Sequence, residues 1–126
     1  MRLFVMAGLL CAAVVPALAQ DQVQEKPLTG SWYMSPALDA EDPKAPADHI
    51  NFSITGDAAK AMWDAMKVKT QPDECVGRMS KWVDGLVCYG PPNPDSGGGL
   101  QPGDSPFECY MGVDLKSGAL ALGNDC

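Results

Sequence analysis

The last twenty residues, Phe107–Cys126, carry the most regular pattern in this sequence. Apolar and polar residues alternate from Phe107 to Leu115, which predicts a half-buried β-strand. Ser117-Gly118 follows as a candidate two-residue turn, so we expect the chain to return as a second strand. In the register set by that turn Cys109 faces Cys126 at a non-hydrogen-bonded position, where Cα atoms lie about 4.5 Å apart and a disulfide can form. The C-terminus is therefore predicted to be a hairpin closed by a Cys109–Cys126 bridge.

The N-terminus has the features of a secretory signal peptide. Met1-Arg2 supplies a positive start, Leu3–Pro16 is an apolar run, and Ala17-Leu18-Ala19 forms a cleavage site. The apolar run is shorter than the roughly 20 residues that a membrane-spanning helix needs. We interpret residues 1–19 as a cleaved signal and the mature protein as periplasmic or secreted, with no membrane span.

The mature chain keeps four cysteines, and an even number in an exported protein predicts two disulfides. Once Cys109–Cys126 is assigned, only Cys75 and Cys88 remain. A Cys75–Cys88 bridge is therefore predicted by elimination, without separate support from the sequence. The spacings contain no C-x-x-C, which leaves a redox motif or a zinc ribbon unsupported.

Charge restricts the class of partner. The whole chain has a net charge of −7, and loss of Arg2 with the signal takes the mature chain to −8. An acidic protein of this kind is not expected to bind nucleic acid or anionic lipid through bulk charge. A protein partner is expected, although neither its identity nor the oligomeric state can be read from the sequence.

Residues 20–48 form an acidic segment broken by prolines, which predicts an extended arm. Gly30–Met34 interrupts it with strand-like composition that could pair with a sheet edge, and Trp32 and Tyr33 are candidate binding residues. The Gly-x-Trp triplet also resembles the first-strand signature of the lipocalins and of small barrel inhibitors that bacteria keep against their own secreted metalloproteases. The early cysteine of those inhibitors is missing here.

Residues 49–126 are predicted to form the disulfide-stapled domain. His49–Thr55 alternates like a strand. Asp57–Lys67 has helical periodicity, with Asp57 as N-cap and the Met62/Met66 pair on the apolar side. Trp63 lies at the border of the two faces. Two interpretations stay open for it, a lid over the core edge and an amphipathic anchor at an interface.

A second hairpin is predicted over Arg78–Tyr89, turned at Asp84-Gly85 and placing Lys81 opposite Cys88. The long loop that follows, residues 90–106, is rich in proline and glycine. It is either disordered or a binding loop, which makes Asp95 and Leu100 candidate binding residues.

Together these elements predict an α+β fold, β-α-β-β-β-β, with one helix on a sheet of four to five antiparallel strands and an extra edge strand near Trp32. The helix is expected to bury its methionines against Ile54, Val113 and Leu115. The order resembles the cystatin-like arrangement over roughly Ile50–Cys126, which also places two sequential disulfides in its later strands. The sequence has no Gln-x-Val-x-Gly loop, so cysteine-protease inhibition is not carried over.

Nothing in the sequence assembles a catalytic set, a metal site or a cofactor site. The single histidine, His49, lacks the context of an activated nucleophile, and the cysteines are expected to be oxidised. We therefore expect a small exported binding module that is not an enzyme, with inhibition of a hydrolase as its narrower form. The alternative is a structural or accessory envelope protein that docks a larger complex through the acidic arm.

Overall fold

The computed structural model describes residues 24–37, 40–97 and 99–121, and within them the protein is an α+β fold with one helix and a six-stranded antiparallel sheet. The elements follow one another as β1 (Thr29–Ser35), β2 (His49–Thr55), α1 (Gly56–Ala65), β3 (Gln71–Asp73), β4 (Arg78–Val83), β5 (Leu86–Pro92) and β6 (Glu108–Asp114).

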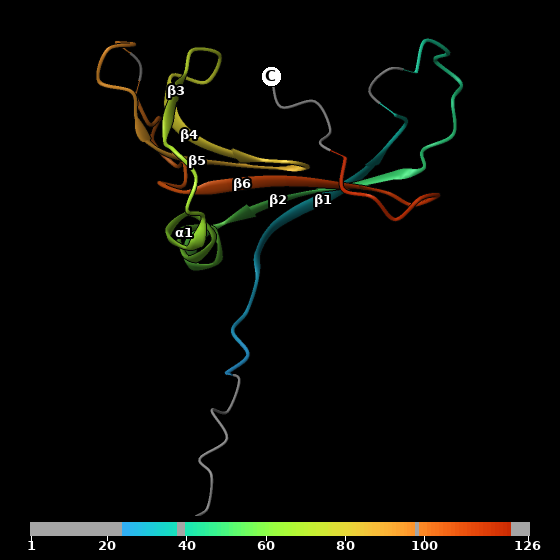
Figure 1. Ribbon diagram of the computed structural model, residues 1–126, viewed down its shortest axis with the longest axis horizontal. Coiled ribbons are helices and arrows are strands. Elements are labelled where there is room, and N and C mark those ends of the chain that lie inside the picture. Colours follow the sequence, from blue (N-terminus) through green and yellow to red (C-terminus); the bar gives the residue numbers. More distant parts are fainter. Residues whose placement is uncertain (1–23, 38–39, 98, 122–126) are drawn as a thin grey trace, which may run out of the picture.

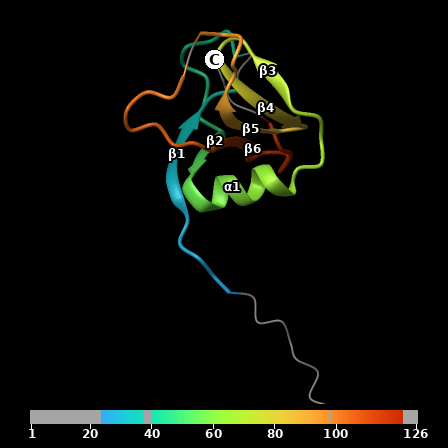
Figure 2. The ribbon, with the colours of Figure 1, turned by 90° about the vertical axis from the view of Figure 1, so that its left-hand side faces the viewer.

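The strands lie in the order β1-β2-β6-β5-β4-β3. After β2 the chain crosses the sheet as α1, reaches the far edge at β3, and returns strand by strand until β6 pairs with β2. Figure 1 shows α1 below the sheet, whereas the β3–β4 turn and the loops after β1 and β5 rise on the opposite side. The view turned by 90° shows α1 lying across the sheet with β1 at one margin (Figure 2). The helix thus covers one face only.

The hydrophobic core lies between α1 and the middle of the sheet. Ile54, Ala59, Cys88 and Cys109 are its buried members, and Met62 and Met66 pack against them as the sequence predicts. Val113 and Leu115 do not belong to this cluster, and Leu115 is exposed, because the helix crosses β6 near its start at Cys109 and Met111.

The helix begins earlier than its periodicity indicates. Thr55, not Asp57, is the N-cap residue, and its side chain makes no capping hydrogen bond. Asp57 lies in the first turn, where a carboxylate interacts favourably with the positive end of the helix dipole. Ala65 is the last helical residue, since the backbone of Met66 is extended. The prediction of Asp57 as N-cap and of helix up to Lys67 is therefore wrong at both ends.

The β4–β5 hairpin has the predicted register from Ser80 to Tyr89, and a β-bulge between Arg78 and Ser80 shifts it by one residue, so that Arg78 pairs with Pro92. Val83 pairs with Leu86 and Lys81 with Cys88 around the Asp84-Gly85 turn, and Gly85 adopts positive φ. The short edge strand β3 was not predicted, because Pro72 and Asp73 are residue types that strands disfavour.

The predicted C-terminal hairpin register is wrong by two residues. Val113 pairs with Leu120 in an isolated bridge, whereas the predicted register places Leu122 opposite Val113. The reason is a wider turn. The Asp114 carboxylate accepts the backbone N–H of Lys116 (2.8 Å), and the amide of Asp114 donates to the carbonyl of Ala119 (2.9 Å). An aspartate that caps the loop in this way replaces the tight turn expected at Ser117-Gly118.

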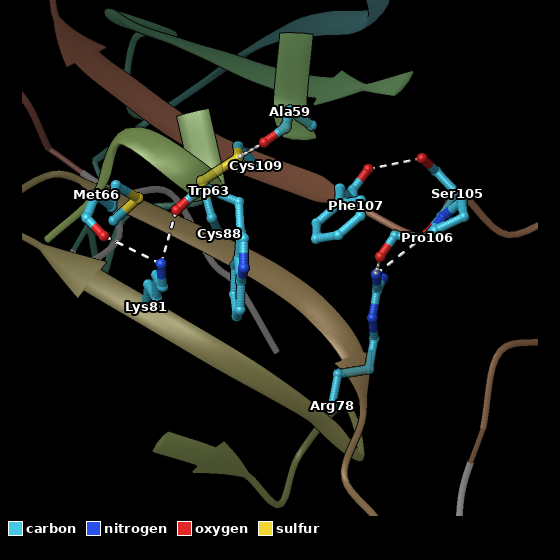
Figure 3. Close-up of a disulfide and its surroundings, with 10 residues drawn as sticks. All are labelled: Ala59, Trp63, Met66, Arg78, Lys81, Cys88, Ser105, Pro106, Phe107 and Cys109. Atoms are coloured by element: carbon cyan, nitrogen blue, oxygen red, sulfur yellow. Dashed lines mark hydrogen bonds between the residues drawn. A yellow bond between two sulfur atoms is a disulfide. The ribbon is translucent and has the colours of Figure 1, made fainter. Parts of the chain in front are cut away.

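The predicted disulfide connectivity is also wrong. Cys88 of β5 is bonded to Cys109 of β6 (Figure 3), with Cα atoms 4.0 Å apart. The two residues face each other across adjacent strands, at the kind of pair where Cα atoms approach most closely. Cys75 is also disulfide-bonded, so its partner is not Cys88. Cys126 lies outside the described residues, as does the predicted signal peptide, residues 1–19.

The predicted number of four to five strands is too low. A β-α-β-β-β-β order is present from β2 onward, but β3 supplies a strand that was not expected. Of the return strand predicted after β6, the described residues end at Ala121 and contain the bridge at Leu120. β1 is the extra strand expected near Trp32, and it raises the total to six.

Candidate functional site

The outer edge of β1 presents the most concentrated apolar surface among the described residues. Leu28, Trp32, Tyr33 and Met34 are 66%, 65%, 47% and 40% exposed, and they lie within seven consecutive residues. We call these four residues the β1 edge. Leu28, Trp32 and Met34 share the helix face of the strand, and Tyr33 lies on the other face. Exposed apolar residues gathered on one short segment mark interaction surfaces more often than isolated ones do.

The backbone of β1 also has free hydrogen-bonding capacity. The Leu115 amide donates to the Asp48 carbonyl (2.9 Å), which fixes the alternation of the β2–β6 ladder. Because neighbouring residues direct their peptide groups to opposite sides, Asn51 and Ser53 of β2 bond toward β1. Their partners are Tyr33 and Ser31, so the N–H and C=O groups of Trp32 and Met34 point away from the sheet.

A shallow cavity lies beside this edge. It has a volume of about 210 Å³ and is lined by residues 28–32 of the β1 segment and by Phe52, Ser53 and Ile54. Gly30 belongs to the lining, and no other residue fits there, because a Cβ would collide with the carbonyl oxygen of Ser53. Glycine at this position therefore lets β1 approach β2 closely beside the cavity.

The opposite edge of the sheet is built differently. β3 has only three residues and contains both Pro72 and the charged Asp73. Short length, proline and charge are the means by which proteins prevent an edge strand from pairing with another chain. β1 has seven residues and carries neither charge nor proline. One edge is protected and the other is left open.

Trp63, for which a core lid and a binding anchor were both predicted, lies partly buried at the border of the core. Its ring packs against Phe107 with centroids 5.9 Å apart, and it lies over Gly90, where a Cβ would come within 2.7 Å of the indole. Lys81 places its ammonium 4.7 Å from the ring centroid and donates to the carbonyls of Trp63 (2.7 Å) and Met66 (3.0 Å) (Figure 3). These contacts support the interpretation of Trp63 as a lid.

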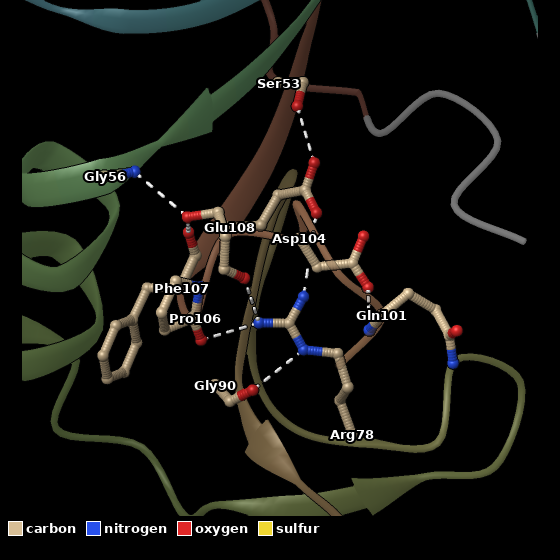
Figure 4. A network of polar contacts seen from close by, with 10 residues as sticks. Ser53, Gly56, Arg78, Gly90, Gln101, Asp104, Pro106, Phe107 and Glu108 are labelled. Carbon is tan, nitrogen blue, oxygen red and sulfur yellow. Dashed lines mark hydrogen bonds and ion pairs between the residues drawn. The ribbon is translucent and has the colours of Figure 1, made fainter. Parts of the chain in front are cut away.

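The loop predicted for residues 90–106 begins later than expected, because β5 extends to Pro92, and Arg78 fixes its base. The buried guanidinium donates to the carbonyl of Gly90 (2.8 Å) at one end of the loop and to those of Ser105 (3.1 Å) and Pro106 (2.7 Å) at the other (Figure 4). Glu108 neutralises it from 3.7 Å. Because the Arg78 side chain binds both ends of the loop, these two ends are held close together where the loop meets the sheet.

Polar contacts continue from Glu108 across the face of the sheet opposite α1. The Ser53 hydroxyl donates to the Glu108 carboxylate (2.9 Å). Burial, with a smaller contribution from Glu108, raises the pKa of Tyr110 to about 12. Its ring also makes an edge contact with Tyr89, at 6.0 Å between centroids. This network holds neighbouring strands together.

The two loop candidates lie apart from the β1 edge. Asp95 is exposed, and its backbone amide donates to the Asn93 side chain (3.1 Å) within a tight turn. Leu100 is partly buried. Neither belongs to the exposed large apolar side chains, so the structure brings together only Trp32 and Tyr33 of the five predicted binding residues.

The single histidine belongs to an electrostatic latch. The Asp48 carboxylate contacts His49 Nδ1 (2.7 Å) and Lys116 Nζ (2.7 Å), which ties the start of β2 to the turn after β6. The Lys116 hydrogen bond, followed by that of His49, lowers the pKa of Asp48. The backbone amide of Lys116 is the main cause of the lowered pKa of Asp114. The latch contains no serine, threonine or cysteine that His49 could activate.

The sequence did not predict three residues described above, two in the β1 edge and one that fixes the long loop. Leu28 and Met34 flank the predicted aromatic pair, and their apolar character in an otherwise acidic segment was the available signal. Arg78 had no such signal, because its role depends on two loop ends that only the tertiary fold brings together. No group of three or more His, Cys, Asp and Glu side chains suited to a metal ion occurs within residues 24–37, 40–97 and 99–121.

Comparisons with known proteins do not assign a family. A scan against protein-family models, a search of curated proteins and a search of solved structures each found no match. In the part of the chain that the structure describes, no helix is long and apolar enough to cross a membrane. The buried disulfide between Cys88 and Cys109 is compatible with an exported protein.

Proposed function

We propose that the protein is a small exported binding module, not an enzyme, that recognises a protein partner through the β1 edge. The observation that carries the proposal is the uncharged, seven-residue edge strand with exposed Trp32, Tyr33 and Met34 and with outward peptide groups. Such an edge offers main-chain hydrogen bonds for affinity, and the adjoining cavity offers selectivity for a side chain.

The scaffold supports this role. The Cys88–Cys109 bond joins β5 to β6, and the β1–β2 ladder extends over all seven residues of β1. The Thr29 hydroxyl donates to the carbonyl of Thr55 (2.8 Å), and Nδ2 of the Asn51 side chain donates to the Ser35 hydroxyl (2.8 Å). Both ends of β1 are therefore bonded to β2 by side chains. A rigid edge loses little conformational freedom when a partner binds.

The test is capture by the mature chain, residues 20–126, from the exported proteins of the source organism. The double variant Trp32→Ser/Met34→Ser removes two exposed side chains of the β1 edge. Val83→Ser/Leu115→Ser is the matched control, because these residues are also exposed and lie outside the β1 edge. We expect capture to be lost in the first variant and kept in the second. Equal capture by both would refute the proposed surface.

Inhibition of a hydrolase is the narrower form of the proposal. The loop of residues 90–106 is the element that would enter an active-site cleft, since Arg78 holds both of its ends. Replacing residues 94–103 with a short Gly-Ser linker keeps the residues that Arg78 contacts. Loss of inhibition with retained capture would assign the loop to inhibition and β1 to binding, whereas unchanged inhibition would exclude the loop.

Docking through the acidic arm is the second candidate. Exposed Glu41 and Asp42 in the segment between β1 and β2 support it. Replacing both by the corresponding amides would abolish capture if charge carries the docking, and capture would also weaken steeply with salt. Capture that resists both changes would leave the β1 edge as the binding surface.

A further inference from the structure

The β1 edge is complementary to a second copy of itself. Pro27 and Pro36 bound the segment on its two sides, and the four exposed apolar residues lie within Leu28–Met34. The centre of that segment is Ser31. An antiparallel pairing of two copies about a two-fold axis at Ser31 therefore places each of the four residues opposite a residue of the same segment in the other copy.

We propose that two copies of this chain associate by pairing their β1 strands antiparallel, with Ser31 facing Ser31 across the two-fold axis. The inference rests on the proposed function only in taking the β1 edge as the binding surface. The outward peptide groups belong to alternate residues that include Trp32 and Met34. In this register Trp32 of one copy forms a hydrogen-bonded pair with Gly30 of the other, so the outward groups meet one another.

The side chains fit in the same register. On the helix face, Trp32 lies opposite Gly30 of the second copy, beside the cavity of about 210 Å³ that Gly30 helps to line. Leu28 lies opposite Met34, so that two apolar side chains meet at each end. On the other face Thr29 lies opposite Tyr33. No pair from Leu28 to Met34 joins two charges, because the segment carries none.

A second copy suits this edge better than a charged partner does. The chain is 20% charged overall, but the seven residues of β1 contain no Asp, Glu, Lys or Arg. Even complete burial of these four residues would cover only roughly 500 Å² per copy, below the approximately 800 Å² per partner of standard interfaces. Each mature copy also carries a charge of −8, which opposes association. The dimer should therefore be weak and concentration-dependent.

Cross-linking through single cysteines tests both the association and the register. Residues on the axis form a non-hydrogen-bonded pair with Cα atoms about 4.5 Å apart, within reach of a disulfide. The Ser31→Cys variant of the mature chain, under mild oxidation, should therefore give a disulfide-linked dimer on non-reducing electrophoresis. Thr29→Cys is the matched control, since Thr29 is also exposed on β1 but lies opposite Tyr33 of the second copy. Equal cross-linking of the two variants would overturn the register.

Sedimentation of the unmodified mature chain tests the dimer without added cysteines. We expect a monomer–dimer equilibrium that Met34→Pro weakens by about tenfold or more, because the substitution removes an outward N–H and leaves the β1–β2 ladder intact. An unchanged urea midpoint for Met34→Pro confirms that it folds. A strictly monomeric protein at all concentrations would overturn the inference. Capture of a different protein that still requires Trp32 would then leave the proposed function standing.

Discussion

Lys81 is predicted to be the charged residue on which the helix most depends. Helix α1 has no basic residue in its last turn, and the carbonyls of Trp63 and Met66 receive the ammonium of Lys81 from β4 instead. The same ammonium lies 4.7 Å from the centroid of the Trp63 ring. Replacing Lys81 with methionine keeps the aliphatic stem, but it leaves two carbonyls at the helix C-terminus without their donor.

The expected loss can be estimated from these contacts. A hydrogen bond to a charged group contributes about 1.5–3 kcal/mol net, and a cation–π contact about 0.5–2 kcal/mol. Two effects offset part of the lost stabilisation. Water can solvate the freed carbonyls in part, and the variant no longer carries the desolvation cost of a half-buried ammonium. We expect Lys81→Met to lower the free energy of unfolding by about 2–3 kcal/mol, which corresponds to a drop in Tm of roughly 8–20 °C for a domain of this size.

Lys60→Met is the matched control. Lys60 is also a lysine near an aromatic ring, 5.3 Å from the centroid of Phe107, but its ion pair with Asp64 is exposed. Such a pair contributes about 0.3–0.5 kcal/mol. Urea denaturation monitored by tryptophan fluorescence measures both variants, with unchanged m-values as the check on two-state behaviour. If the two variants lose the same free energy of unfolding, Lys81 does not cap the helix and the reasoning fails.

Two further predictions follow from ionisable groups. Because burial raises the pKa of Tyr110 to about 12, one of the three tyrosines should ionise near that pH in a spectrophotometric titration, and Tyr110→Phe should remove that step; its persistence would refute the assignment. The pKa of Asp48 is lowered by its contacts with Lys116 and His49, so the stability that it contributes is complete above the unfolded value of about 4 and is lost as pH falls through the lower folded value. Asp48→Asn should therefore flatten the acid limb of a stability profile, and an unchanged limb would contradict the latch.

Local signals predicted local structure well. The Asp84-Gly85 turn specified both the β4–β5 hairpin and its register, because a two-residue turn fixes which residues face each other. The same reasoning failed after β6. There the side chain of Asp114 caps a wider turn, so the register moved by two residues.

The sequence did not predict which strands pair when they are far apart in the chain. Cys88 and Cys109 lie 21 residues apart, on strands joined by the proline-rich loop, and no turn chemistry indicates that these strands are neighbours. The same limit applies to the candidate site. Composition predicted a strand around Trp32, but whether its side chains would be covered depended on β1 lying at the sheet margin.

The distribution of charged contacts separates a scaffold from the proposed binding surface. Two cations of β4 hold the structure, since Arg78 closes the long loop and Lys81 caps the helix. β1 carries no charge, and its outward groups bond to nothing within the described sheet, whose order ends at β1. Substitutions in the scaffold should therefore change stability and binding together. A substitution of Trp32 should change binding alone, because its side chain is already largely in water in the free protein. This difference between the effects of scaffold substitutions and of a Trp32 substitution is what we expect if the β1 edge binds a partner.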